Sequence, residues 1–276
     1  MEPLTFDPAG ECIYCGAQEE LSREHVIPFA LGGRVVLPDS SCARCAAETS
    51  AFEGRLLRSP NWWPLRRALD LATRHAKRQP DSFALSVKAA GQTFSVDVKV
   101  SSYPLIVAVF DFDPPVHLTG APVPAGGETH AIAQRVFAWN VRALQFGGGF
   151  ETLLNGRLVA PRTDVTLRVD MSADDLARLL AKIALAWAAG RYGVRAFEAI
   201  YVRDIIVGAG LEPNRWIGSA SVHPQFDGRA LHVIRDAIVG RDLVVYIQLF
   251  RPPPGWEQPS VYQVVVGRLS PVGSAM

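Results

Sequence analysis

The chain has 276 residues, of which 49% are hydrophobic and 20% are charged, and its formal net charge is +1. This length and apolar content suffice for one large domain or two ordinary ones with a substantial core. A net charge close to zero gives no bulk electrostatic sign of a nucleic-acid-binding protein. No apolar run approaches the roughly 18 residues of a membrane-spanning helix, and the N-terminal residues lack the basic start and apolar centre of a signal peptide. We therefore expect a cytoplasmic protein without a membrane partner.

All four cysteines lie in one N-terminal segment, as two C-x-x-C pairs made by Cys12 with Cys15 and by Cys42 with Cys45. Each pair forms a tight turn that directs two thiolates at one ion, and two pairs complete a tetrahedral zinc site. A chance or purely redox arrangement is the alternative. Two pairs in one segment favour metal binding over it, and over a secreted disulfide framework. The spacing predicts one structural Zn²⁺ bound by the four thiolates.

Between and after these pairs the sequence predicts a β-β-α unit. Residues 21–27 favour a short strand, the glycines at 32–33 favour a hairpin turn, and residues 34–37 favour a returning strand. Ser40 or Ser41 can cap a helix that continues to residue 57. The zinc ion would then join the start of the helix to the base of the hairpin.

The segment combines Ser22-Arg-Glu24-His25-Val-Ile-Pro28, the Gly-Gly pair, the two C-x-x-C pairs and Phe52-Glu53. In these residues, over about the first quarter of the chain, it resembles HNH endonucleases of the ββα-metal type. The resemblance implies hydrolysis of phosphodiester bonds, with His25 as the general base and Glu24 as a ligand of a catalytic Mg²⁺ or Mn²⁺. Imidazole titrates near neutral pH and carboxylate oxygens suit these hard ions, so both residue types fit those roles.

The second ligand of the catalytic ion departs from the family pattern. Many HNH proteins have Asn or His directly after the last cysteine, where this chain has Ala46, and a methyl group binds no metal. Glu53 lies seven residues further along the same predicted helix face and matches an acid of similar HNH proteins, so the resemblance implies a structural or metal-linked role for it. A solvated acid on the helix surface is the alternative. Asp39 is a further oxygen donor in the segment.

Residues 55–78 are strongly basic and include Trp62 and Trp63. Basic side chains neutralise phosphates and indole rings stack on bases, so this stretch is the predicted nucleic-acid interface. Alternatively it is a linker helix over residues 63–75 with packed tryptophans and solvated arginines. The predicted nucleic-acid contacts are Arg55, Arg58, Arg66, Arg67, Arg74, Lys77 and Arg78.

The remainder predicts alternating strands and one long helix. Ser172 and Asp175 form a capping-box-like start to an apolar helix that ends near residue 189, and residues 196–207 fit a helix or a strand equally well. The predicted strands are 83–87, 93–100, 105–112 and 136–146, followed by an antiparallel meander at 231–238, 243–250 and 261–269.

The sequence as a whole predicts an α+β protein. Residues 1–80 would form an HNH-like ββα-metal zinc module with a basic linker helix, and residues 81–276 a larger α+β domain with an antiparallel sheet and one long buried helix. The predicted function is a metal-dependent endonuclease that cuts DNA, with the C-terminal domain setting target or activation, or binding a protein partner or a second copy. The alternative, motivated by Ala46, is an inactive zinc module that only binds nucleic acid or a protein; the retained Glu24-His25 pair favours the nuclease.

Overall fold

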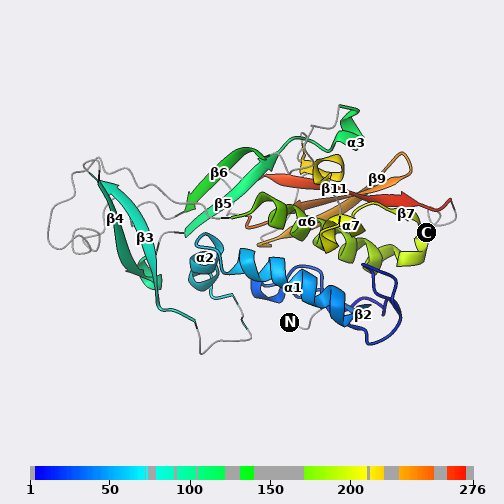
Figure 1. Ribbon diagram of the computed structural model, residues 1–276, viewed down its shortest axis with the longest axis horizontal. Coiled ribbons are helices and arrows are strands. Elements are labelled where there is room, and N and C mark those ends of the chain that lie inside the picture. Colours follow the sequence, from blue (N-terminus) through cyan, green and yellow to red (C-terminus); the bar gives the residue numbers. More distant parts are fainter. Residues whose placement is uncertain are drawn as a thin grey trace. The chain divides into compact units, whose positions relative to one another are not determined.

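The computed structural model describes residues 4–71, 73, 79–89, 92–103, 105–121, 131–139, 171–209, 212–220, 230–251 and 260–271. Helices and antiparallel sheets both occur in these residues, which confirms the α+β class (Figure 1). The chain divides into two compact units, one made of residues 1–56, 109–135 and 172–276, and the other of residues 57–108 and 136–171.

The first unit begins with the predicted β-β-α arrangement. Strand β1 (Ser22–His25) pairs antiparallel with β2 (Val36–Ser41), so that Glu24 lies opposite Leu37 and His25 opposite Val36. Helix α1 (Ala43–Leu57) follows directly after β2. The second strand therefore begins later than predicted, while the order of elements is confirmed.

The connection between β1 and β2 is longer than a two-residue hairpin turn, because it contains the short 3-10 helix η1 (Phe29–Leu31). Both glycines that follow it are required by the backbone. Gly32 has φ of 83°, a left-handed conformation that glycine adopts without strain. A Cβ on Gly33 would lie 1.8 Å from the carbonyl oxygen of Ile27, so no other residue fits there without a backbone shift.

The long buried helix is confirmed as α6 (Ala173–Tyr192). The Ser172 hydroxyl caps it by accepting a hydrogen bond of 3.2 Å from the backbone N–H of Asp175. Thirteen residues of α6 are buried, including the consecutive run from Leu179 to Ala186. A helix that is buried on all sides lies between two layers of the protein.

One of these layers is an antiparallel sheet with the strand order β7-β11-β10-β9, to which β8 adds by pairing with β11. The predicted meander is confirmed as its last three strands, and α6 packs against β10 and β11. Residues 196–207 contain both a strand and a helix, which explains their mixed pattern. The sheet and its neighbouring short helices are β7 (Phe197–Ile200), α7 (Arg203–Val207), α8 (Pro213–Trp216), β8 (Ile217–Ser219), β9 (Val233–Val239), β10 (Asp242–Gln248) and β11 (Val261–Leu269), with η4 (Val194–Ala196) before β7 and α3 (Val116–Thr119) beside α8.

The other layer against α6 is the cysteine-bearing β-β-α segment, which belongs to the same unit (Figure 1). Asp175 of α6 accepts two hydrogen bonds, of 2.7 and 2.6 Å, from the guanidinium of Arg55. One helical turn further, the guanidinium of Arg178 lies 4.6 Å from the ring centroid of Phe52. Helix α6 is therefore held between the N-terminal segment and the C-terminal sheet.

The second unit contains helix α2 (Trp62–Ala68) and the hairpin of β3 (Ser82–Ala89) and β4 (Gln92–Lys99), which is followed by η3 (Val100–Ser102). Trp63, Phe83 and Tyr103 make successive edge-to-face contacts, so Trp63 serves as a packing residue. Helix α2 ends earlier than the predicted 63–75 helix, in a turn where Asp70 has φ of 50°.

Strand β5 (Leu105–Phe112) confirms the predicted strand over the same residues, and it pairs with β6 (Ala131–Trp139). The predicted strand at 136–146 overlaps only the end of β6, and its residues 140–146 lie outside the described residues. No helix in the described part of the chain is both long and apolar enough to cross a membrane.

The predicted domain boundary at residue 80 stays a prediction, and the grouping into units follows the contacts of the folded chain. Residues 1–56 group with the C-terminal residues 172–276 rather than with the adjoining residues 57–80. The physical reason is α6, whose polar and apolar contacts reach both the N-terminal segment and the sheet.

Candidate active site and metal centre

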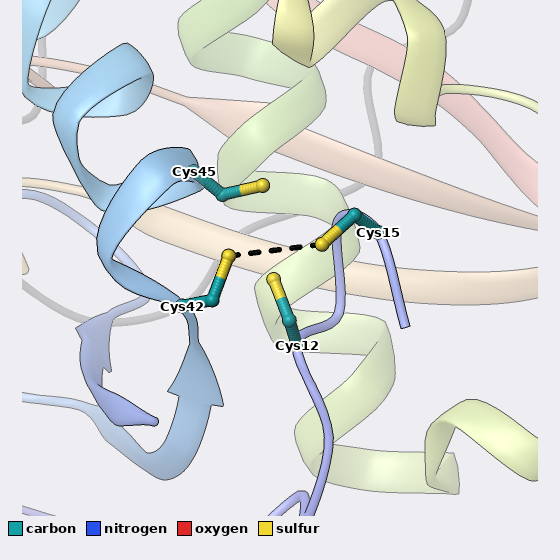
Figure 2. Close-up of side chains that lie close together, drawn as sticks. All are labelled: Cys12, Cys15, Cys42 and Cys45. Carbon is teal, nitrogen blue, oxygen red and sulfur yellow. Dashed lines mark hydrogen bonds between the residues drawn. The ribbon is translucent and has the colours of Figure 1, made fainter. Parts of the chain in front are cut away.

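The four cysteines converge from two elements, a loop and the start of a helix (Figure 2). Cys12 and Cys15 lie on a turn closed by hydrogen bonds from Cys12 N to Ala17 O and from Gly16 N to Cys12 O, both 2.7 Å long. Cys42 directly precedes α1, and Cys45 lies in its first turn. The Sγ atoms all lie within 4.8 Å of one another, and those of Cys15 and Cys42 are 3.7 Å apart.

The thiols differ in their readiness to ionise. Burial raises the pKa of Cys12 and of Cys45. Burial also acts on Cys15, but the backbone N–H of Ala17 and the neighbouring thiols outweigh it and lower the pKa of Cys15 to about 7. The positive end of the α1 dipole also favours thiolates at this position.

These four thiols fit a zinc site. Four converging sulfur atoms match the soft, tetrahedral donor set of Zn²⁺, and the ion would supply the positive charge that four close thiolates need. Within the described residues, no other group of three or more His, Cys, Asp and Glu side chains lies close enough to hold a metal. The cysteines are thus the candidate metal centre, and four thiolates would fill the coordination of a tetrahedral ion, as in a structural site.

Glu24 lies on β1 with both carboxylate oxygens engaged by side chains. The hydroxyl of Tyr14, between the first two cysteines, donates a hydrogen bond of 2.9 Å to Oε2. The ammonium of Lys182 lies 2.9 Å from Oε1. Burial, together with the charge of Glu24, raises the pKa of Tyr14 well above its usual range, so its hydroxyl remains protonated and continues to donate.

Lys182 comes from the middle of α6, and its side chain is 0% exposed. Besides Glu24, its ammonium lies 3.0 Å from Oε1 of Glu53 and donates to the carbonyl oxygen of His25. Burial alone would lower the pKa of Lys182, but the two carboxylates outweigh it and raise the pKa above its ordinary value. The ammonium therefore stays charged at neutral pH and joins β1, α1 and α6 at one point.

Glu53 is thereby placed in the site rather than in solvent, with a side chain that is 17% exposed. Helix α1 carries it to the same ammonium that Glu24 contacts, and its expected structural or metal-linked role stays a prediction. Ala46 is half-buried on α1, and its N–H donates a hydrogen bond of 2.9 Å to Cys42 O in the first turn of the helix. Asp39 is exposed and has φ of 45°.

His25 follows Glu24 on β1, where successive side chains point to opposite faces of the hairpin. Its ring lies 5.6 Å from the ring of Phe29, and the side chain is half-buried. The Glu24 carboxylate and the His25 imidazole therefore occupy different environments, one with Lys182 and the other beside an exposed aromatic ring.

The catalytic Mg²⁺ or Mn²⁺ expected from the resemblance does not fit the Glu24–Glu53 pair in this arrangement. An ion bound there would share its carboxylate oxygens with an ammonium group about 3 Å away. A divalent and a monovalent cation 4 Å apart repel each other by about 8 kcal/mol at an effective dielectric constant of about 20. Mg²⁺ also requires a nearly octahedral set of oxygen ligands, and Ala46 supplies none.

The predicted nucleic-acid contacts have varied surroundings. Arg55 is bound to Asp175, Arg67 lies 3.5 Å from Asp81, and Arg58 is exposed. Arg66 is buried and donates to Leu57 O, so its guanidinium does not face solvent, and burial lowers its pKa. Arg74, Lys77 and Arg78 lie outside the described residues.

Two residues of the site, Lys182 and Tyr14, were not singled out from the sequence. Lys182 had a visible signal, because it is a lone charge in the middle of the apolar run Leu179-Leu-Ala-Lys-Ile-Ala-Leu185. A lysine on the buried face of a helix requires counter-charges. The sequence alone does not say which carboxylates supply them.

Residues 12–58 match the family model of the HNH endonucleases. The matched segment contains the four cysteines, Glu24, His25 and Glu53, and it ends just beyond α1. No curated protein and no solved structure matches the chain significantly.

Proposed function

Because its N-terminal segment matches the HNH endonuclease family, we propose that this protein is a nuclease that hydrolyses phosphodiester bonds in DNA. The observation that carries the proposal is the pair Glu24-His25 on strand β1 of the matched segment, beside a four-cysteine centre. A module that only binds has no need of a general base, so the retained Glu24-His25 pair of the matched segment favours the nuclease.

In this mechanism His25 accepts the proton of the attacking water, and the four cysteines would hold zinc as a structural ion that fixes the Cys12–Cys15 turn relative to the start of α1. The imidazole can act as a base at neutral pH because its ordinary pKa lies close to 7. Exposed basic side chains such as Arg58 are proposed to contact phosphates.

A second candidate function is a catalytically inactive zinc module that binds nucleic acid or a protein. It is favoured by the ammonium of Lys182 on the acid pair and by Ala46 at a usual metal-ligand position. The C-terminal part would then supply the partner-binding surface, for another protein or a second copy of this chain.

Cleavage assays separate the two functions. Supercoiled plasmid and an RNA of matching sequence are incubated with zinc-loaded protein in Mg²⁺, in Mn²⁺ and in EDTA. We expect plasmid nicking by the wild type and a loss of about 10²–10⁴-fold in rate for His25→Ala. The variant should keep its zinc content and DNA affinity, since Lys182 bonds the backbone oxygen of His25 and not its ring.

His117→Ala is a matched control, because His117 is a half-buried histidine outside the matched segment. It should cleave like the wild type. Equal cleavage by His25→Ala and wild type would contradict the role of His25. DNA binding without cleavage in any condition would favour the inactive module.

A further inference from the structure

We propose that Lys182 is the resident cation of the Glu24–Glu53 pair, and that these two acids therefore bind no divalent metal ion. An ammonium group has three N–H donors. Here it has three oxygen partners, which are Oε1 of Glu24, Oε1 of Glu53 and the carbonyl oxygen of His25. A fully buried ammonium whose donors are all used is a complete site by itself.

The lysine cannot withdraw in the way that a surface lysine can. Its side chain is 0% exposed, and it lies in the consecutive buried run from Leu179 to Ala186 of a helix held between the N-terminal segment and the sheet. Asp175, two turns earlier on α6, holds the same layers together through Arg55. Moving the ammonium away from the acids would require moving α6 out of the core.

The carboxylate of Glu24 also has a protein partner at its second oxygen. Oε2 of Glu24 accepts a hydrogen bond from the buried hydroxyl of Tyr14, so both of its oxygens already have protein partners. Tyr14 is 2% exposed and lies on the cysteine-bearing turn. A metal ion at Glu24 would have to share these oxygens with the hydroxyl and with the ammonium, whose positive charge would repel it.

The two acids thus connect the HNH module to α6, and any cleavage would proceed without an ion at this pair. A divalent ion is expected to bind only when the lysine charge is removed, because two neighbouring buried carboxylates then need another cation. This gives a test with a readout other than nuclease activity.

The first measurement is a Mn²⁺ titration of the zinc-loaded, full-length protein, followed by electron paramagnetic resonance of the free ion. We expect wild type and Glu24→Gln to show the same weak, non-saturating uptake. A saturable Mn²⁺ site of micromolar affinity in the wild type that Glu24→Gln abolishes would overturn the proposal.

The second measurement uses Lys182→Met, which keeps most of the side-chain volume and removes the charge. We expect its melting temperature to fall by about 10 °C, because two buried carboxylates lose their counter-charge, and Mn²⁺ to bind to this variant and recover much of the loss. Lys99→Met, at an exposed lysine, is the matched control and should behave like the wild type. A Lys182→Met variant that melts like the wild type and gains no Mn²⁺ site would contradict the proposal.

A third variant covers the case in which Lys182→Met does not fold. The combined change Lys182→Met, Glu24→Gln and Glu53→Gln replaces the charged group by a neutral one of similar shape and should fold without binding Mn²⁺. Neither measurement depends on cleavage, so a protein that never cuts DNA would refute the proposed function while the Mn²⁺ result still decides the role of Lys182.

Discussion

His232 joins the HNH module to the sheet through both ring nitrogens. Nε2 lies 2.8 Å from Leu31 O at the end of η1, and Nδ1 accepts a hydrogen bond of 3.1 Å from Phe250 N. Only the neutral imidazole with its proton on Nε2 satisfies both contacts, because the protonated ring has no acceptor. Burial lowers the pKa of His232 to about 4.

These two hydrogen bonds of His232 predict that the folded protein becomes less stable in acid. The folded-state pKa of about 4 lies below the ordinary value of 6.5, so the unfolded chain takes up the proton first as pH falls. The contribution of neutral His232 to the free energy of unfolding is present above pH 6.5 and is lost as the pH drops from there through 4. Between pH 7 and pH 5 the free energy of unfolding falls by about 2 kcal/mol for this reason. Urea unfolding of the wild type and of His232→Gln at these two pH values measures it.

Glutamine is the appropriate replacement because its amide can donate and accept but does not titrate. We expect His232→Gln to lose less stability than the wild type between pH 7 and pH 5. An identical pH dependence of the unfolding free energy in both proteins would show that His232 does not cause the loss of stability.

At the level of elements, the start of α1 depends on the metal centre. Cys42 directly precedes the helix and Cys45 is in its first turn, while Cys12 and Cys15 reach the site from a loop with little regular structure. The hairpin of β1 and β2 is short, with strands of four and six residues. Structural zinc binding contributes folding free energy on the order of 10 kcal/mol.

Cys42→Ser should therefore release zinc and unfold the module. Serine is a favourable residue at the start of a helix, so a loss of stability can be assigned to the missing thiolate rather than to the helix itself. Elemental analysis and thermal melting, with the exposed Ser50→Ala on the same helix as control, test this. Zinc-free wild-type protein with an unchanged melting temperature would rule out the structural role.

At the level of the whole molecule, the chain returns to its own N-terminal segment. Lys182 contacts Glu24 and Glu53, Arg203 donates to Ile13 O, and His232 contacts Leu31 O, all across long stretches of sequence. A separate domain of residues 81–276, as predicted from the sequence, would instead fold without the zinc module, since it contains its own helix and strands.

These contacts lead to the opposite expectation for a truncated chain of residues 82–276. Without the first 81 residues, α6 would expose one of its apolar faces, and Asp175 and Lys182 would lose their partners. We expect aggregation or a non-cooperative melt, measured by size-exclusion chromatography and circular dichroism alongside the full-length protein. A soluble fragment with cooperative unfolding would support the boundary near residue 80.

Local features were predictable from the sequence because their causes are local. The spacing of the cysteines, the Gly-Gly pair after β1 and the cap at Ser172 each depend on residues within a few positions of one another, and the corresponding elements are present. The mixed pattern of residues 196–207 was also informative, since a strand and a helix both occur there.

The partners of Glu24 and Glu53 were decided only by the tertiary structure. The resemblance implied a metal-ligand role for Glu24 and a structural or metal-linked role for Glu53, but Lys182 was not singled out, and it follows His25 by 157 positions. No local periodicity relates residues so far apart. Which ammonium meets which carboxylates depends on how α6 packs between two layers, because a buried charge is stable only where packing brings its counter-charges within contact distance.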